Sequence, residues 1–574
     1  MATDNKYDRQ LRLWGKQGQM RLATANVLVF GAGPTATETL KNLVLPGLGR
    51  FTIVDGATVG STDLGNNFFV TEDSVGAPRA EVVCDLLVEM NPDDCVGTAR
   101  VADPATLVAT EPAFIADFSL VIATMMAPAT LAALGKMCWE RGIPLVVVRS
   151  HGFLGYLRLQ LRDHEVVETK PDTTHWDLRI DQPFPALTAL VASYDLDSMD
   201  FKDHMHTPYV VLLLKALEAW KRKRGAAPAN FKENTELKAL LKSMERLPAA
   251  SPNQGQDQSQ SGGGGGVSGG TNREANFEEG YKNFHRWKPR ALSENVESIL
   301  ASVRSGAKPL AGGGGGGRGA VASDFLFLVH ALVEFMDNEG GGKPPLTGSL
   351  PDMEADNPKY IALQRCYESK ASEDVGSVAA RVATLLEANG RPRDAISLEA
   401  VQVFCKNAWD LKAVTTRTLE QESLSPLLDP GAVFDAADES LWPQCPLLWY
   451  IALKGTDQFQ MATGRYPGSN PDADEASLAS DAEKVWSEMN ALLRKASPSE
   501  GGEGGGGVEF SQLNESYAAE VCRFGCSFEV HNVAAFMGGA AAQECVKVIT
   551  KQWAPANNTF IYNGIAGTAA TYEF

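Results

Sequence analysis

Residues 26–55 read NVLVFGAGPTATETLKNLVLPGLGRFTIVD, and this stretch is the strongest structural signal in the 574-residue chain. An apolar run, Val27–Phe30, leads into a glycine turn, and a helix-like segment then leads into a second apolar run that ends on Asp55. A strand, a glycine turn, a helix and a strand, with an acidic residue about twenty positions after the glycines, make up a nucleotide-binding βαβ unit. We therefore expect an α/β protein whose Rossmann-like fold begins here.

The glycine loop of this unit has the sequence GAGPTA at 31–36 and departs from the usual GxGxxG pattern. Gly31 permits a tight turn, and Gly33 lets the backbone approach a phosphate at the start of a helix. Asp55 is placed to accept a hydrogen bond from a ribose hydroxyl. Proline and alanine are tolerated at their positions, so the loop indicates the fold but leaves nucleotide binding open. An NAD-dependent oxidoreductase stays an alternative, although no downstream residues supply a hydride-transfer site.

Composition restricts the classes of function. The formal net charge of -19 argues against a protein that holds nucleic acid or an anionic membrane surface. No apolar run approaches the roughly eighteen residues of a membrane-spanning helix, and the charged start MATDNKYDRQ predicts no secretory signal. The nine cysteines are scattered without a disulfide framework, which indicates reduced thiols in a cytoplasmic and nuclear protein.

Strand-like and helix-like segments alternate through the first part of the chain. Apolar runs predict buried strands at 119–124 and 143–148, with a helix at 128–141 between them. The segment 152–161 predicts an antiparallel strand that leaves the domain. Residues 1–170 are therefore expected to form the first part of a Rossmann-like domain, with a mostly parallel sheet covered on both sides by helices.

Residues 171–510 differ in character, and we expect a mostly helical insert there. Its helix-like segments include 359–369 and 373–387, where apolar residues recur at helical spacing. Residues 511–574 return to α/β character with a helix at 534–551, so both ends of the chain are expected to build one domain. The glycine-rich tracts predicted to be surface loops lie at 251–270, 311–318 and 501–507.

Two further groups of residues could carry chemistry, and we favour a structural role for each. His204 and His206 form a His-x-His pair that could ligate zinc, but no Cys-x-x-Cys pair accompanies it, so no metal site is expected. Cys445 lies between two prolines in an apolar segment without a basic neighbour, which favours a buried core thiol over a reactive thiolate.

Several motifs occur in an order that resembles one family. They are KYDRQLRLWG (6–15), GAGPTATETLKNLVLPGLGRFTIVDG (31–56), LGNNFFVTEDSVGAPRAE (64–81), HTPYV (206–210), GSLPDMEADNPKYIALQ (348–364), GRYPG (464–468) and AAFMGGAAAQECVKVITKQ (534–552). Together they are similar to the activating enzymes of ubiquitin-like proteins, most of all to the regulatory subunits of heterodimeric members that act in neddylation. The resemblance implies a ThiF-type adenylation fold. It also implies a catalytic partner subunit that adenylates the modifier with ATP. The partner then takes the modifier as a cysteine thioester for transfer to a conjugating enzyme, which ultimately modifies cullins.

At several positions the chain departs from the catalytically active members of that family. Asn66 stands where they carry an arginine, and Arg79 stands in place of a lysine. Met125 and Met126 follow the strand 119–124 where a magnesium-binding aspartate is expected, and none of the nine cysteines is followed by threonine as in the catalytic pair. The resemblance therefore implies a pseudo-enzyme half that binds neither ATP nor magnesium. The vestigial nucleotide-binding residues are Gly31, Gly33 and Asp55.

The resemblance assigns Arg9 the only contact with ATP. In the family, the arginine of Tyr-Asp-Arg-Gln reaches across the dimer to the nucleotide of the other subunit, where ATP and magnesium are bound. An arginine in trans is a reasonable way to stabilise developing phosphate charge. The helical insert is expected to frame a groove for the modifier. A self-sufficient activating enzyme that uses Cys445 stays a further alternative. The residues expected at the interface with a partner are Asp352, Met353, Lys359, Tyr360 and Leu363.

Overall fold

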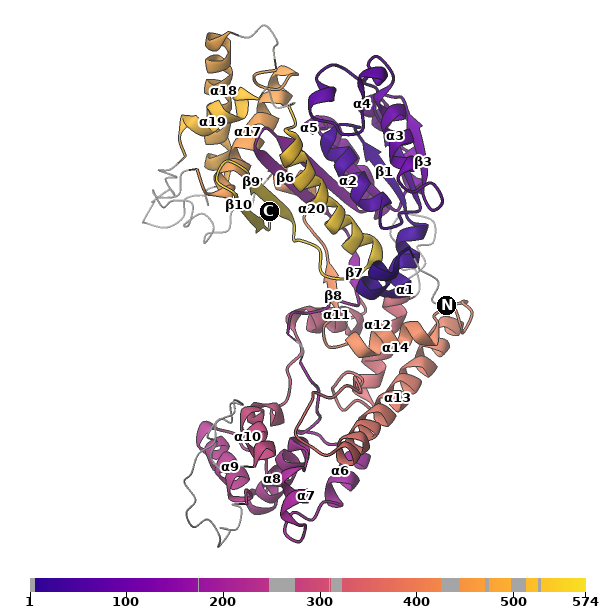
Figure 1. Ribbon diagram of the computed structural model, residues 1–574, viewed down its shortest axis with the longest axis vertical. Coiled ribbons are helices and arrows are strands. Elements are labelled where there is room, and N and C mark those ends of the chain that lie inside the picture. Colours follow the sequence, from indigo (N-terminus) through magenta and orange to yellow (C-terminus); the bar gives the residue numbers. More distant parts are fainter. Residues whose placement is uncertain are drawn as a thin grey trace, which may run out of the picture. The chain divides into compact units, whose positions relative to one another are not determined.

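The computed structural model describes residues 6–173, 175–246, 274–308, 310, 323–424, 443–469, 474–496, 513–524 and 528–574. The chain divides into two compact units (Figure 1). Unit 1 comprises Met1–Lys170 and Lys412–Phe574, and unit 2 comprises Pro171–Leu411. The chain therefore returns to the first unit at Lys412, about a hundred residues before the return that the sequence indicates. Within the described residues, no helix is both long and apolar enough to cross a membrane.

Unit 1 is built on one eight-stranded sheet in the order β10-β9-β6-β5-β4-β1-β2-β3. The strands β1 to β5 run parallel, and β6, β9 and β10 continue the sheet with antiparallel pairing. This arrangement confirms the predicted Rossmann-like α/β fold with its antiparallel exit strand. The strands are β1 (Asn26–Phe30), β2 (Arg50–Val54), β3 (Val96–Arg100), β4 (Leu120–Thr124), β5 (Leu145–His151), β6 (Leu154–Gln160), β9 (Thr559–Asn563) and β10 (Thr568–Tyr572).

Helices cover the sheet of unit 1, and two from opposite ends of the chain, α2 and α20, pack side by side (Figure 1). Gly538 permits their close approach, because a Cβ atom there would lie 2.6 Å from the Cβ of Glu38. The helices are α1 (Asp8–Thr24), α2 (Pro34–Val44), α3 (Arg79–Glu89), α4 (Pro104–Thr110), α5 (Pro128–Arg141), α15 (Leu419–Leu424), α17 (Pro446–Thr463), α18 (Glu475–Ala496), α19 (Glu515–Arg523) and α20 (His531–Thr550).

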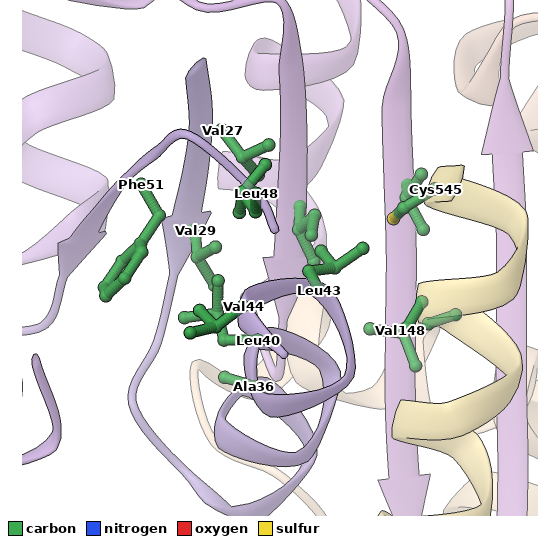
Figure 2. Close-up of a cluster of buried hydrophobic side chains, with 14 of the residues drawn as sticks. Val27, Val29, Ala36, Leu40, Leu43, Val44, Leu48, Phe51, Val148 and Cys545 are labelled. Atoms are coloured by element: carbon green, nitrogen blue, oxygen red, sulfur yellow. The ribbon is translucent and has the colours of Figure 1, made fainter. Parts of the chain in front are cut away.

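The core of unit 1 lies on both faces of the sheet. Val27 and Val29 of β1 belong to the cluster that contains α2 and α20, whereas Leu28 and Phe30 belong to the cluster on the other face. Figure 2 shows Val27 and Val29 in the cluster with Leu40 of α2. Successive side chains of a strand point to opposite faces, so a strand that is buried on both faces needs an unbroken apolar run. This explains the sequence VLVF.

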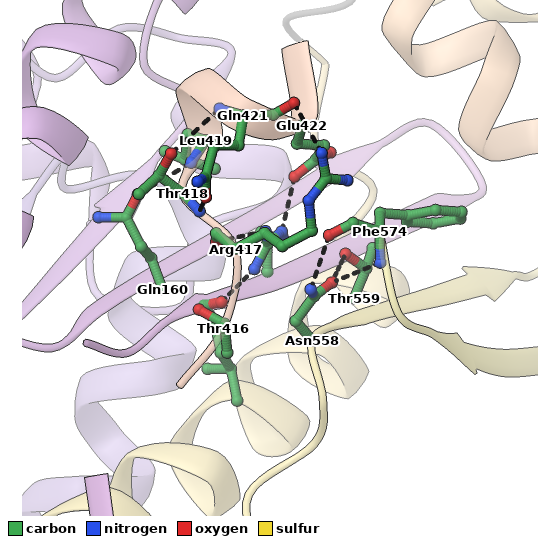
Figure 3. A network of polar contacts seen from close by, with 12 residues as sticks. Gln160, Thr416, Arg417, Thr418, Leu419, Gln421, Glu422, Asn558, Thr559 and Phe574 are labelled. Carbon is green, nitrogen blue, oxygen red and sulfur yellow. Dashed lines mark hydrogen bonds and ion pairs between the residues drawn. The ribbon is translucent and has the colours of Figure 1, made fainter. Parts of the chain in front are cut away.

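Residues after Lys412 belong to unit 1 because strand pairing and core packing tie them to it. β7 (His164–Val166) pairs antiparallel with β8 (Lys412–Val414). The backbone N–H of Leu419 donates to Oε1 of Gln160 at 2.9 Å (Figure 3). Trp449 of α17 is completely buried in the core of the sheet. These partners lie hundreds of residues apart in sequence, so local patterns do not predict them.

In the part of unit 2 that the structure describes, the regular elements are all helices. We expected separate helices at 359–369 and 373–387, and this was wrong, because α13 is one helix of 32 residues. Lys370 stands in the supposed gap and pairs with Asp374 one turn on at 2.8 Å, so nothing interrupts the helix. The helices are α6 (Pro185–Ala192), α7 (Phe201–Met205), α8 (Tyr209–Arg224), α9 (Phe231–Ser243), α10 (Ala275–Lys282), α11 (Glu294–Arg304), α12 (Asp324–Asp337), α13 (Asn357–Ala388) and α14 (Leu398–Asn407).

Candidate functional site

The glycine loop lies where β1 ends and α2 begins, at the carboxyl ends of the parallel strands. Gly31 has a φ of +97°, and a Cβ atom there would collide with the hydroxyl of Thr124. That hydroxyl donates to the carbonyl of Phe30 at 2.8 Å and so ties β4 to β1 at this point. Glycine is thus required at position 31 by the backbone and by its neighbour, whether or not a nucleotide binds.

A carboxylate of the chain itself lies at the first turn of α2. Oε1 of Glu529 accepts hydrogen bonds from the backbone N–H of Thr35 at 3.2 Å, from the hydroxyl of Thr35, and from the hydroxyl of Ser150 at 3.2 Å. The other carboxylate oxygen lies so close to Gly33 that a Cβ atom there would collide with it. Glu529 therefore occupies the place over the loop where such a fold normally holds a phosphate.

The surroundings of Glu529 hold it firmly in that place. Burial raises the pKa of Glu529, and the hydrogen bonds from Thr35 and Ser150 offset this only in part. Asn66 donates from Nδ2 to the backbone carbonyl of Glu529 at 3.0 Å. Asn66 stands at the position where the resemblance implied an arginine, and it anchors the segment that carries Glu529.

Asp55 is also engaged by donors from its own chain. Its Oδ2 accepts from the backbone N–H of Ala32 at 2.7 Å and from Arg79, with Nε at 3.0 Å and Nη2 at 2.8 Å. Its Oδ1 accepts from the backbone N–H of Ala57 at 2.8 Å. Arg79 is held in turn by Asp63 at 3.0 Å. A ribose hydroxyl would have to displace these donors, so Asp55 acts here as the centre of an internal ion-pair network.

The residues after β4 do not fit a magnesium ion. Met126 is buried in the apolar core, and its backbone carbonyl accepts a hydrogen bond from the hydroxyl of Tyr466 at 3.4 Å. Across the described ranges, no group of three or more His, Cys, Asp or Glu side chains could hold a metal ion. A carboxylate at the phosphate position and a thioether at the metal position are both wrong for ATP-Mg. The residues present therefore do not fit that cofactor.

Arg9 is exposed on the first turn of α1. The residue before α1, Tyr7, donates from its hydroxyl to Asp94 at 2.7 Å and accepts from Nδ2 of Asn91 at 2.9 Å, which fixes the start of the helix on unit 1. Arg12 pairs with Asp8 at 2.8 Å on the same helix. Among the residues that the structure describes, none forms a hydrogen bond or ion pair with Arg9.

The residues expected at a partner interface lie at the start of α13 and just before it. Asp352 is exposed, and Met353 and Tyr360 are half-buried. Lys359 is half-buried and pairs with Asp203 at 3.0 Å. Leu363 is completely buried in the core of unit 2, so its side chain anchors α13 to that core and is not part of the surface.

His204 and Cys445 are both buried in the structure. Nδ1 of His204 lies 2.7 Å from Oε1 of Glu274, and both side chains are buried, whereas His206 is half-buried and contacts the carbonyl of Lys202 at 3.0 Å. Cys445 is buried in the core of unit 1 as the residue before α17. Glu529, the residue that sequence reasoning missed, lies 494 positions from Thr35. No local spacing could have revealed their contact.

Comparisons with known proteins extend over nearly the whole chain. The ThiF family model matches residues 7–573. A NEDD8-activating enzyme E1 regulatory subunit of Xenopus laevis is 38% identical over 572 residues, covering 99% of this chain and 98% of that protein. The protein of the same name from Danio rerio is 37% identical over 575 residues, covering 100% and 99%. The Arabidopsis thaliana NEDD8-activating enzyme E1 regulatory subunit AXL is 37% identical over 573 residues, covering 98% and 97%.

These matches confirm the resemblance that the sequence motifs indicated. They include both units of the chain, and they extend over nearly the full length of each relative. The chain therefore belongs to the ThiF family and, within it, to the NEDD8-activating enzyme E1 regulatory subunits.

Proposed function

We propose that this chain is the non-catalytic subunit of an enzyme that activates the modifier NEDD8. The observation that carries the proposal is the internal occupation of the nucleotide site: Glu529 lies over the glycine loop, and Arg79 engages Asp55. A chain that fills its own phosphate and ribose positions cannot adenylate a carboxyl group there. The chemistry then belongs to a catalytic subunit, which adenylates the C-terminus of the modifier with ATP and takes it as a cysteine thioester.

Arg9 is the residue through which this chain contributes to that chemistry. Adenylation joins a carboxylate to the α-phosphate of ATP, so cations that offset the triphosphate charge accelerate it. The support for Arg9 is its position on a fixed, exposed helix start and the Tyr-Asp-Arg-Gln motif around it. ATP and magnesium are bound by the catalytic subunit, and Arg9 reaches them in trans.

Unit 2 contributes to a surface for the partner and the modifier. Its proposed contacts are Asp352, Met353, Lys359 and Tyr360, which lie at or near the surface. Lys359 is preorganised for this role, because Asp356 at 2.7 Å and Asp203 at 3.0 Å fix its ammonium group. Preorganised side chains lose less entropy on binding.

The first test measures NEDD8-dependent exchange between ATP and pyrophosphate. The isolated chain is expected to give no exchange above background, and addition of the catalytic subunit is expected to restore it. Exchange catalysed by this chain alone would contradict the proposal. A parallel fluorescence titration with NADH is expected to show no saturable binding, because Glu529 already occupies the first turn of α2. Saturable binding would instead favour the oxidoreductase alternative.

A second prediction concerns the pH dependence of stability. The raised pKa of Glu529 means that its contribution to stability is complete below its unfolded value of 4.5 and is lost as pH rises through the folded value. Replacing Glu529 with glutamine keeps the shape and removes the titration. At pH 8 the variant is expected to be unchanged or more stable by up to about 1 kcal/mol. Below pH 5 the wild-type protein is expected to be at least as stable as the variant.

The measurement is the thermal midpoint of both proteins from below pH 5 up to pH 8, with Glu515→Gln as the matched control. Glu515 is exposed, so its replacement is expected to leave the pH profile unaltered. If Glu529→Gln kept the full pH slope of the wild-type protein, Glu529 would not be the buried carboxyl described here.

A further inference from the structure

The helix that carries Arg9 is broken shortly after it. Gly15 has φ 69° and ψ 178°, so Asp8–Trp14 forms a separate helical segment at the start of α1. The last carbonyls of a helical segment have no partner within it and need donors from elsewhere. Where these donors come from determines how firmly the segment, and Arg9 with it, is held.

Two side chains from distant parts of unit 1 supply those donors. The ammonium group of Lys170 donates to the carbonyl of Leu13 at 2.6 Å, and Nε2 of Gln552 donates to the carbonyl of Trp14 at 2.8 Å. Lys170 and Gln552 are also joined to each other, with Nζ and Oε1 at 3.0 Å. Gln552 lies two residues after the end of α20, and α20 packs against α1 (Figure 1). We name these two residues the Lys170–Gln552 clamp.

The clamp is itself fixed by its surroundings. The ammonium group of Lys170 lies 3.9 Å from the centre of the Trp553 ring, a cation–π contact that limits its movement. Gln552 is buried and donates from Nε2 to Glu168 at 3.0 Å. The backbone N–H of Trp553 donates to the carbonyl of Glu168 at 2.9 Å. Both clamp side chains therefore have little freedom, and the carbonyls they hold are fixed as well.

The other end of the segment is fixed by Tyr7, through Asp94 and Asn91 as described above. An exposed arginine thus lies on a short segment that is held at both ends. A freely placed arginine loses side-chain and backbone entropy when it orders on a phosphate, and prior ordering of the backbone removes part of that cost. A misplacement of about 1 Å in such a group can lower the rate on the order of 100-fold.

We propose that Lys170 and Gln552 are positioning residues for Arg9, which hold the Asp8–Trp14 segment so that the guanidinium meets the triphosphate bound by the catalytic subunit. This inference rests on the proposed role of Arg9. It assigns Lys170 and Gln552 no contact with ATP. Their effect on the reaction passes through Arg9 alone, and this makes the inference separable from a general structural role.

The test is a double-mutant cycle in the assembled heterodimer, with ATP–pyrophosphate exchange as the readout. Lys170→Met removes the ammonium group and keeps most of the side-chain volume. It is expected to raise the KM for ATP about tenfold and to leave the KM for the modifier unchanged. In the Arg9→Ala background, the same replacement is expected to change nothing further, because residues that act through one group are not additive. Lys170→Arg, which keeps a cationic donor, is expected to restore most of the ATP affinity.

The controls separate the possible failures. Lys16→Met alters an exposed lysine just after the break and is expected to leave the KM for ATP unchanged. If Lys170→Met lowered activity equally with and without Arg9, or had no effect while Arg9→Ala did, the positioning role would be overturned. If Arg9→Ala itself had no effect, the proposed role of Arg9 would fail and the inference with it. Should Lys170→Met not fold, Lys170→Gln provides the same comparison with a smaller change.

Discussion

Replacement of Arg9 with alanine is expected to lower kcat/KM for ATP in the heterodimer on the order of 1,000-fold, the lower end of the effect of an arginine supplied in trans to a transferring phosphoryl group. The Arg9 side chain is exposed and pairs with none of the described residues, so we expect its removal to change the stability of the folded chain little. The loss therefore falls on the reaction. The measurement is the initial rate of ATP–pyrophosphate exchange over a range of ATP concentrations.

The matched control is Arg12→Ala on the same helix. The Arg12 side chain is 80% exposed and pairs only locally with Asp8, a contact worth about 0.5 kcal/mol or less. It is expected to change kcat/KM for ATP less than twofold. Arg9→Lys keeps the charge but not the planar fork of donors, so an intermediate rate is expected. Equal rates for wild-type protein and Arg9→Ala, with an intact heterodimer, would return Arg9 to a purely structural role.

The parts of the fold that depend on neighbouring residues could be predicted from the sequence. The β1–α2–β2 unit follows from two apolar runs and the glycine turn between them. The bounds of α5 at Pro128–Arg141 agree with the prediction. Its start is marked by proline and its end by Gly142, which adopts a left-handed conformation with φ 68°. Ser323 precedes α12 as a residue type that favours the start of a helix, and its side chain accepts from the N–H of Leu326.

Elements whose place depends on contacts between distant segments could not be predicted from the sequence. No strand is predicted at 96–100 because β3 is the edge strand of the sheet, and its residues are exposed or half-buried and not consistently apolar. The return of the chain at Lys412 depends on pairing with β7, which lies about 250 residues earlier. The sequence predicts a mostly helical insert over 171–510. The helices α17 and α18 fall within that range but pack in unit 1, so helical character alone does not locate the boundary between the units.

At the glycine loop, some features could be predicted from the local sequence and others depend on contacts between distant segments. The departures at Asn66, Arg79 and Met126 are visible in the sequence and predict that this chain binds neither ATP nor magnesium. The side chains at the glycine loop and at Asp55 are visible only in the structure. Glu529 lies over the loop, and Arg79 pairs with Asp55. Asn66, Arg79 and the backbone of Met126 each make a hydrogen bond within the protein, so all three positions contribute to the internal contacts of unit 1.

The largest expected effect on stability comes from Glu422→Gln. Glu422 is buried and accepts from Nε of Arg158 at 2.7 Å, from Nζ of Lys454 at 2.9 Å and from the hydroxyl of Tyr450 at 2.8 Å. The side chain of Arg158 is completely buried, so loss of the carboxylate charge leaves a cation in the core without its counter-ion. Breaking a buried pair in this way costs about 3–5 kcal/mol. A fall of roughly 5–10 °C in the thermal midpoint of unit 1 is expected.

The pH dependence gives this prediction a second readout. Burial alone would raise the pKa of Glu422, but Lys454 and Arg158 outweigh it and hold the pKa at about 2, below the ordinary value of 4.5. A lowered pKa stabilises the folded state above pH 4.5, and this stabilisation is lost as pH falls toward 2. Glu422→Gln is expected to lack that part of the acid transition. Glu420→Gln, on the exposed side of the same helix, is the matched control and is expected to behave like the wild-type protein. A Glu422→Gln protein with an unchanged midpoint at pH 7 would mean that Arg158 and Lys454 are solvated, which contradicts the buried network.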